Sequence, residues 1–135
     1  MGSRDLQEDS PVSDQGPDDL RDLEALRLRL RRFADERDWE QFHSPKNLAM
    51  ALSVEAAELV EIFQWLTEEQ SAALDDTCRR RAADELADVL VYLVRLADRL
   101  GVDLLRAAAS KVADNERKYP AGQVRGQARK YDEYD

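Results

Sequence analysis

The chain has 135 residues, of which 20 are Lys or Arg and 29 are Asp or Glu, so its formal net charge is −9. This length supports one domain with its own hydrophobic core. The excess of acids argues against nucleic acid and membrane surfaces as partners, because both are polyanions. No uncharged run reaches the roughly 20 residues that span a bilayer, and no signal-peptide pattern is present. We therefore expect a cytoplasmic protein.

Rare residue types exclude further classes of site. One cysteine, Cys78, and one histidine, His43, cannot form an intrachain disulfide, a cysteine-rich zinc site or a multi-histidine metal centre. Residues 17–100 contain no glycine, whereas phosphate-binding loops and dinucleotide-binding turns need clustered glycines. Prolines are equally sparse, and Ala, Leu, Glu and Arg are abundant. The chain is therefore predicted to be all-α.

The first predicted helix covers about residues 18–37, because apolar side chains recur there every three or four positions. Residues 1–17, which are polar and contain glycine and proline, are expected to be a disordered leader. Residues 38–43 show no helical period and are expected to form an irregular connection.

The second predicted helix begins at Ser44-Pro45, because serine is a preferred N-cap and proline fits the first helical position. It is expected to reach about Leu66. Thr67 and Gln70 then have the spacing of a capping box, which predicts a short additional helical piece.

The third and fourth predicted helices reach about Leu100 and Pro120. Gly101 lies between them, where a glycine commonly follows the end of a helix. Four helices with short connections favour an antiparallel four-helix bundle over residues 18–120. The glycines, the many charges and the lack of an apolar period over residues 121–135 predict a flexible C-terminal tail.

Acidic side chains interrupt the apolar face of the second predicted helix. At about 100° per residue, Glu55 lies in the middle of the arc formed by Leu48, Leu52 and Leu59, and Glu58 lies at its edge. Both carboxylates are therefore predicted to point into the bundle.

The third predicted helix repeats this arrangement with Glu85 and Asp88, which share a face with Val89 and Leu96. An unpaired buried carboxylate costs several kcal/mol, and four close together would repel one another. A divalent cation removes this cost, and a set of oxygen ligands suits Mg²⁺, with Mn²⁺ as a substitute.

Two alternatives compete with a magnesium site. The acids could pair with arginines, and Arg79, Arg80, Arg81 and Arg95 are available. A di-iron bundle would need Glu-x-x-His motifs on facing helices, and His43 lies outside any such motif. We therefore set the di-iron alternative aside.

Residues outside the acidic pairs suggest a phosphate and a base as ligands. Lys111 and Asn115 share a face of the fourth predicted helix and could contact phosphate oxygens, although on spacing alone a solvated basic edge explains them better. A flat base could stack among aromatic side chains, each of which could instead be ordinary core. These aromatic residues are Trp39, Phe42, Trp65 and Tyr92.

The motifs together resemble the MazG-like all-α nucleoside triphosphate pyrophosphohydrolases. The matching segments are Ser44-Pro45-Lys46-Asn47-Leu48, Glu55-x-x-Glu58, Phe63-Gln64-Trp65 and Glu85-x-x-Asp88. Residues 38–43 and 111–120 are similar to the dCTP pyrophosphatase subgroup of this family. One departure is Leu30, which stands where mammalian members carry a substrate-contacting histidine on the first helix, so a strict dCTP preference is not implied.

The resemblance implies Mg²⁺-dependent hydrolysis of a nucleoside triphosphate, such as dCTP or a related or modified pyrimidine dNTP, to the monophosphate and pyrophosphate. The implied metal ligands are Glu55, Glu58, Glu85 and Asp88, with Glu55 or Glu58 as the general base. The implied substrate-binding residues are Trp39, Glu40, Gln41, Phe42, His43, Trp65, Tyr92, Lys111 and Asn115. The resemblance also implies a homodimer or homotetramer whose pockets are completed by a second subunit.

Two rival functions stay open at this point. One is a related all-α enzyme that acts on dUTP or phosphoribosyl-ATP. The other is a non-catalytic helical oligomerisation module in which arginines neutralise the acids.

Overall fold

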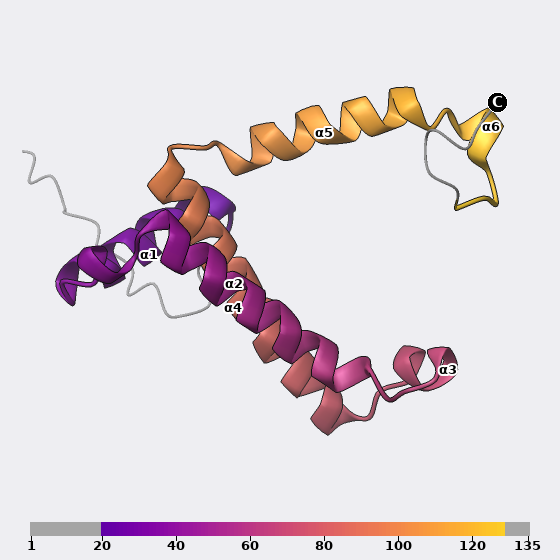
Figure 1. The fold of residues 1–135 in the computed structure, drawn as a ribbon, viewed down its shortest axis with the longest axis horizontal. Coiled ribbons are helices and arrows are strands. Elements are labelled where there is room, and N and C mark those ends of the chain that lie inside the picture. The colour runs from indigo at the N-terminus through magenta and orange to yellow at the C-terminus, as the bar shows by residue number, and fades with distance from the viewer. Residues whose placement is uncertain (1–19, 129–135) are drawn as a thin grey trace, which may run out of the picture.

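The computed structural model describes residues 20–128, and every regular element in this part of the chain is helical (Figure 1). The predicted leader over residues 1–17 and the end of the predicted tail, residues 129–135, lie outside it. The elements in chain order are α1 (Leu23–Glu36), the 3-10 helix η1 (Glu40–Phe42), α2 (Pro45–Phe63), α3 (Glu68–Ala72), α4 (Asp76–Leu100), α5 (Leu104–Lys118) and α6 (Ala121–Val124).

The capping residues expected from the sequence start and end these helices. The Ser44 side chain accepts a hydrogen bond from the backbone N–H of Asn47 at the start of α2. Thr67 and Gln70 form the predicted capping box of α3. Gly101 ends α4 with φ = 67°, a left-handed conformation that glycine adopts without steric cost.

Two predicted helix boundaries were wrong, and one short helix was not predicted. α1 begins at Leu23 and not near residue 18, because Asp22 accepts the backbone N–H of Ala25 at 2.7 Å and acts as the N-cap. α2 ends at Phe63, before the capping box of α3, and not at about Leu66. A short helix, α6, occupies part of the segment predicted to be a flexible tail.

The main packing contact is between α2 and α4, which lie side by side, and α1 packs against α4 (Figure 1). The small buried core comprises Ala34, Leu48, Ala82, Val94 and Ala97. It couples the helices that carry the predicted acidic pairs, so the backbone around those acids is well supported.

The four-helix bundle stays a prediction, because α5 extends away from the α2–α4 pair in the single chain (Figure 1). Large apolar side chains on α2, α4 and α5 consequently remain exposed. They include Met50, Val54, Val60, Leu86, Leu90, Leu105 and Val112. Within residues 20–128, no helix is both long enough and apolar enough to cross a membrane.

Candidate metal and nucleotide site

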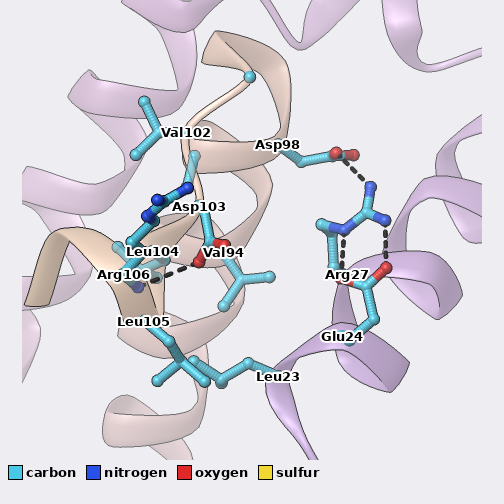
Figure 2. A pocket seen from close by; sticks show the side chains of 12 residues that line it. Leu23, Glu24, Arg27, Val94, Asp98, Val102, Asp103, Leu104, Leu105 and Arg106 are labelled. Atoms are coloured by element: carbon cyan, nitrogen blue, oxygen red, sulfur yellow. Dashed lines mark hydrogen bonds and ion pairs between the residues drawn. The ribbon is translucent and has the colours of Figure 1, made fainter. Parts of the chain in front are cut away.

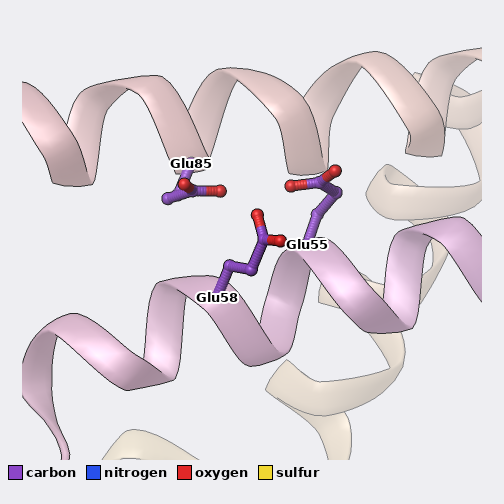
Figure 3. Close-up of side chains that lie close together, drawn as sticks. All are labelled: Glu55, Glu58 and Glu85. Carbon is purple, nitrogen blue, oxygen red and sulfur yellow. The ribbon is translucent and has the colours of Figure 1, made fainter.

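Three glutamates converge between α2 and α4. Glu55 and Glu58 are one helical turn apart on α2, and Glu85 faces them from α4 (Figure 3). One carboxylate oxygen from each residue lies within 4.8 Å of the others. All three side chains are half-buried. The three carboxylates thus lie between α2 and α4 (Figure 3).

No cation of the described chain neutralises this cluster. The ion pairs between described residues all lie elsewhere. The Oε2 atoms of Glu55 and Glu85 are buried and have no hydrogen-bond partner. The alternative in which arginines neutralise the acids therefore finds no support, and Arg95 is paired with other residues.

The pKa values of Glu55 and Glu85 show that ionising these clustered acids is unfavourable. Burial, together with the adjacent carboxylate of Glu58, raises the pKa of Glu55 to about 7. The same two causes raise the pKa of Glu85. The three carboxylates together form a set of hard oxygen donors, and a divalent cation between them would offset the repulsion and burial that raise the pKa values of Glu55 and Glu85.

Asp88 belongs to the edge of this cluster. It lies one turn beyond Glu85 on α4, its side chain is exposed, and it is not among the three acids whose oxygens converge. Its negative charge nevertheless contributes to the raised pKa of both Glu55 and Glu85. Asp88 is thus near enough to act on the cluster electrostatically.

An aromatic segment precedes α2. Trp39 and Phe42 are 42% and 60% exposed, so their rings offer free surface. The Trp39 ring packs edge-on against Phe33 and His43, with centroid distances of 5.5 and 6.0 Å. The Gln41 side-chain amide donates to the backbone oxygen of Asp38 at 3.0 Å, which closes the turn before η1.

A network of arginines and acids, which we did not predict, joins this segment to α1 and α4. Asp98 is 5% exposed and is bonded to Arg27, Arg31 and Arg95. Glu40 is bonded through one carboxylate oxygen to Arg95 and through the other to Arg99. We call these four arginines, with Asp98 and Glu40, the arginine network.

The other predicted substrate-binding residues lie at different distances from this centre. Tyr92 is half-buried on α4, and Trp65 is 86% exposed beyond the end of α2. Lys111 and Asn115 lie on α5, which extends away from the helices that carry the acids (Figure 1). The single chain therefore does not bring all the predicted residues together.

An open groove of about 840 Å³ lies between α1, the end of α4 and the start of α5 (Figure 2). Its lining includes Leu23, Val94 and Leu105, and Arg27 bridges Asp98 and Glu24 at its edge. None of the predicted metal ligands or substrate-binding residues lines it.

The sequence matches known proteins over the region that carries this site. The model of the MazG-like family matches residues 50–134, which include the three glutamates and Asp88. The chain belongs to the MazG-like family. Membership confirms the resemblance inferred from the spacing of the Glu-x-x-Glu and Glu-x-x-Asp motifs, and it accounts for the all-helical fold.

Curated and solved proteins show the same MazG-like relationship. Human dCTP pyrophosphatase 1 is 50% identical over 113 residues, and the bovine protein of the same name is 49% identical over 111. The alignments cover 82% and 81% of this chain but 66% of each relative, so the chain spans just under two thirds of their length. A solved pyrophosphatase from Archaeoglobus fulgidus is 41% identical, with a TM-score of 0.69 over 73% of this chain and 92% of that one.

Proposed function

We propose that the chain is a Mg²⁺-dependent nucleoside triphosphate pyrophosphohydrolase that acts on dCTP or related pyrimidine dNTPs, including modified ones. The observation that carries this proposal is the cluster of Glu55, Glu58 and Glu85, which is half-buried and has no cation of its own. The names of the human and bovine relatives and of the archaeal structure supply the reaction class.

The three glutamates, together with Asp88, would hold Mg²⁺ or Mn²⁺. When bound, the ion would offset the repulsion between a triphosphate and this acidic chain and orient the phosphates. An ion at this position would also orient the nucleotide, with its phosphates toward the acids of α2 and α4.

A carboxylate of the cluster acts as general base in this proposal. Water attacks the α-phosphorus, the new P–O bond forms as the bond to the bridging oxygen breaks, and pyrophosphate leaves. Glu55 or Glu58 takes the proton of the attacking water.

The nucleoside would lie against the aromatic segment before α2. The exposed faces of Trp39 and Phe42 suit stacking on a base, since every base has a π-face. Tyr92 and Trp65 would add to this pocket. The carboxylate of Glu40 is engaged by two arginines, so we assign it to holding the segment and not to direct contact with the base.

We further propose that the active form is a homodimer or homotetramer. The exposed apolar side chains of α2, α4 and α5 need a cover, and a second copy would supply one. In such an assembly, α5 of one copy would bring Lys111 and Asn115 to the phosphates held by the other. This arrangement would also complete the predicted helical bundle.

One assay tests the reaction class. Pyrophosphate release is measured with a panel of NTPs, dNTPs, dUTP and phosphoribosyl-ATP, with Mg²⁺, with Mn²⁺ and with EDTA. The proposal expects the monophosphate and pyrophosphate from pyrimidine dNTPs, and only with metal. Preferred cleavage of dUTP or phosphoribosyl-ATP would replace it with the nearer rival. No turnover of any substrate would favour the oligomerisation module.

A further inference from the structure

A buried arginine ties η1 to α4. Arg95 is only 3% exposed, and its three side-chain nitrogens donate hydrogen bonds to three different residues. Nη2 donates to Glu40 Oε1. Nη1 donates to Asp98 Oδ2 at 3.2 Å, and Nε donates to Nδ1 of His43 at 3.2 Å. Two of the three acceptors belong to the short segment that carries the aromatic rings.

The bond to His43 determines where its imidazole carries its proton. A guanidinium stays protonated at any physiological pH and can only donate, so Nδ1 must accept and the proton lies on Nε2. Burial and the positive charge of Arg95 hold the pKa of His43 below its usual range. His43 is therefore a neutral imidazole with a single tautomer at neutral pH.

The segment around η1 is also held at its two ends, where the Trp39 N–H donates to the Ala34 backbone oxygen at 2.9 Å and the Asn47 side-chain amide donates to the Phe42 backbone oxygen at 3.1 Å. It comprises a single 3-10 turn, in which none of the residues Glu40–Phe42 is buried. Arg99 adds a second anchor, because its Nε donates to the His43 backbone oxygen at 3.1 Å. Arg95 and Arg99 thus add polar anchors from α4 to the contacts that α1 and α2 make with this segment.

We propose that Arg95 is a positioning residue of the nucleoside pocket, which holds the Trp39–His43 segment against α4 and fixes His43 as an Nε2–H donor. This inference rests on the proposed function, which places the nucleoside against that segment. Arg95 lies ten residues beyond Glu85 on α4, about 15 Å along the helix axis, so it acts on the base end of the pocket and not on the acids.

The test compares Arg95→Met with Arg31→Met in the full chain. Arg31 also bonds Asp98 but makes no contact with Glu40 or His43, so its variant controls for damage to the arginine network alone. For Arg95→Met we expect KM for dCTP with Mg²⁺ to rise about tenfold while kcat changes less than about threefold. Arg31→Met should keep the KM of the wild type.

Imidazole ¹⁵N NMR provides a readout that needs no turnover. The chain has one histidine, so every imidazole signal belongs to His43. The wild type and Arg31→Met should show the Nε2–H tautomer alone. Arg95→Met should show a mixture of tautomers, because nothing then selects the proton position.

Arg95→Lys guards against a Met variant that fails to fold. Lysine keeps the positive charge, but its ammonium group cannot donate to three acceptors in the planar geometry of a guanidinium. The KM of Arg95→Lys should therefore lie between the KM of the wild type and that of Arg95→Met. An unchanged KM in both Arg95 variants, a retained single tautomer, or an equal rise in KM for Arg31→Met would overturn the inference. A wild type without pyrophosphohydrolase activity would instead overturn the proposed function, and the pocket role of Arg95 with it.

Discussion

The two halves of α4 carry partly buried acids in opposite ways. Near its start, Glu85 faces two glutamates of α2, and within the described chain no cation pairs with any of the three. Near its end, Asp98 is 5% exposed and is bonded to Arg27, Arg31 and Arg95. Arginines of α1 and α4 therefore neutralise the acid near the end of α4, whereas the acid in its first half has no counter-ion within the described residues. Such a contrast indicates that the unneutralised half is built for a cation from solution.

The pKa values of the two halves move in opposite directions. Burial alone would raise the pKa of Asp98, but the hydrogen bonds from Arg31 and Arg27 outweigh burial and hold this pKa below its usual range. Burial and the neighbouring acids raise the pKa of Glu55 to about 7. Ionised Asp98 therefore stabilises the fold through its ion pairs. Ionising Glu55 costs free energy, which a bound cation would offset.

The largest expected effect is on turnover, from changes to the acids of α2 and α4. Glu58→Gln or Asp88→Asn should reduce kcat about a thousandfold or more, since each would remove an oxygen ligand of the proposed metal site, while helix content by circular dichroism stays unchanged. The exposed acids Glu61 and Asp84 lie on the same two helices. Glu61→Gln and Asp84→Asn should keep wild-type rates, and near-wild-type rates in the first two variants would remove those acids from the site.

Neutralising Asp98 should destabilise the metal-free protein, whereas neutralising Glu85 should stabilise it. Asp98→Asn leaves three guanidinium groups without their shared partner and should cost about 3 kcal/mol in the free energy of unfolding. Glu85→Gln removes a charge that is both desolvated and repelled, so it should raise the unfolding midpoint of the metal-free protein. Urea unfolding in EDTA measures both, and a destabilised Glu85→Gln would contradict the comparison.

A smaller effect is expected at the aromatic segment. Trp39→Ala removes a ring that is 42% exposed and should raise KM for pyrimidine dNTPs about tenfold, with kcat little changed. Phe33 contacts Trp39 and provides a control, because Phe33→Leu perturbs the ring packing without removing the stacking surface. Equal KM values for wild type and Trp39→Ala across the pyrimidine panel would take Trp39 out of the pocket.

The sequence was sufficient to predict features that depend on local spacing. Serine, threonine and glycine at helix ends predicted α2, α3 and the end of α4, because capping involves residues within one turn. Acids three residues apart on apolar faces predicted the cluster between α2 and α4, since helix periodicity places side chains on a face.

Features that depend on distant residues could not be predicted in this way. Arg95 bonds Glu40, which lies 55 positions away, and Arg27 bonds Asp98, which lies 71 positions away. Arginines on a helix usually face solvent, so the sequence pattern alone did not separate these from the others. The direction of α5 after Gly101 is likewise undetermined by spacing, because the apolar face of α5 has no partner within the described chain.

The last expected effect is the pH dependence of metal binding. The folded pKa of Glu55, about 7, lies above its ordinary value of 4.5. The folded metal-free protein therefore holds a proton that the unfolded chain has released, and its stability falls as pH rises from about 4.5 to 7. Mg²⁺ displaces this proton, so its apparent affinity should rise by up to about tenfold per pH unit in the same range and level off above pH 7.

Thermal unfolding with and without Mg²⁺ between pH 5.5 and pH 8.5 measures this linkage. The Mg²⁺-induced rise in the unfolding midpoint should be larger at pH 8 than at pH 6 and should vanish in Glu58→Gln. The shift should persist in Asp98→Asn, because Asp98 lies in the half of α4 that arginines of α1 and α4 already neutralise. A metal-induced shift that is independent of pH, or one that is lost in Asp98→Asn but kept in Glu58→Gln, would reverse the roles assigned to the two halves.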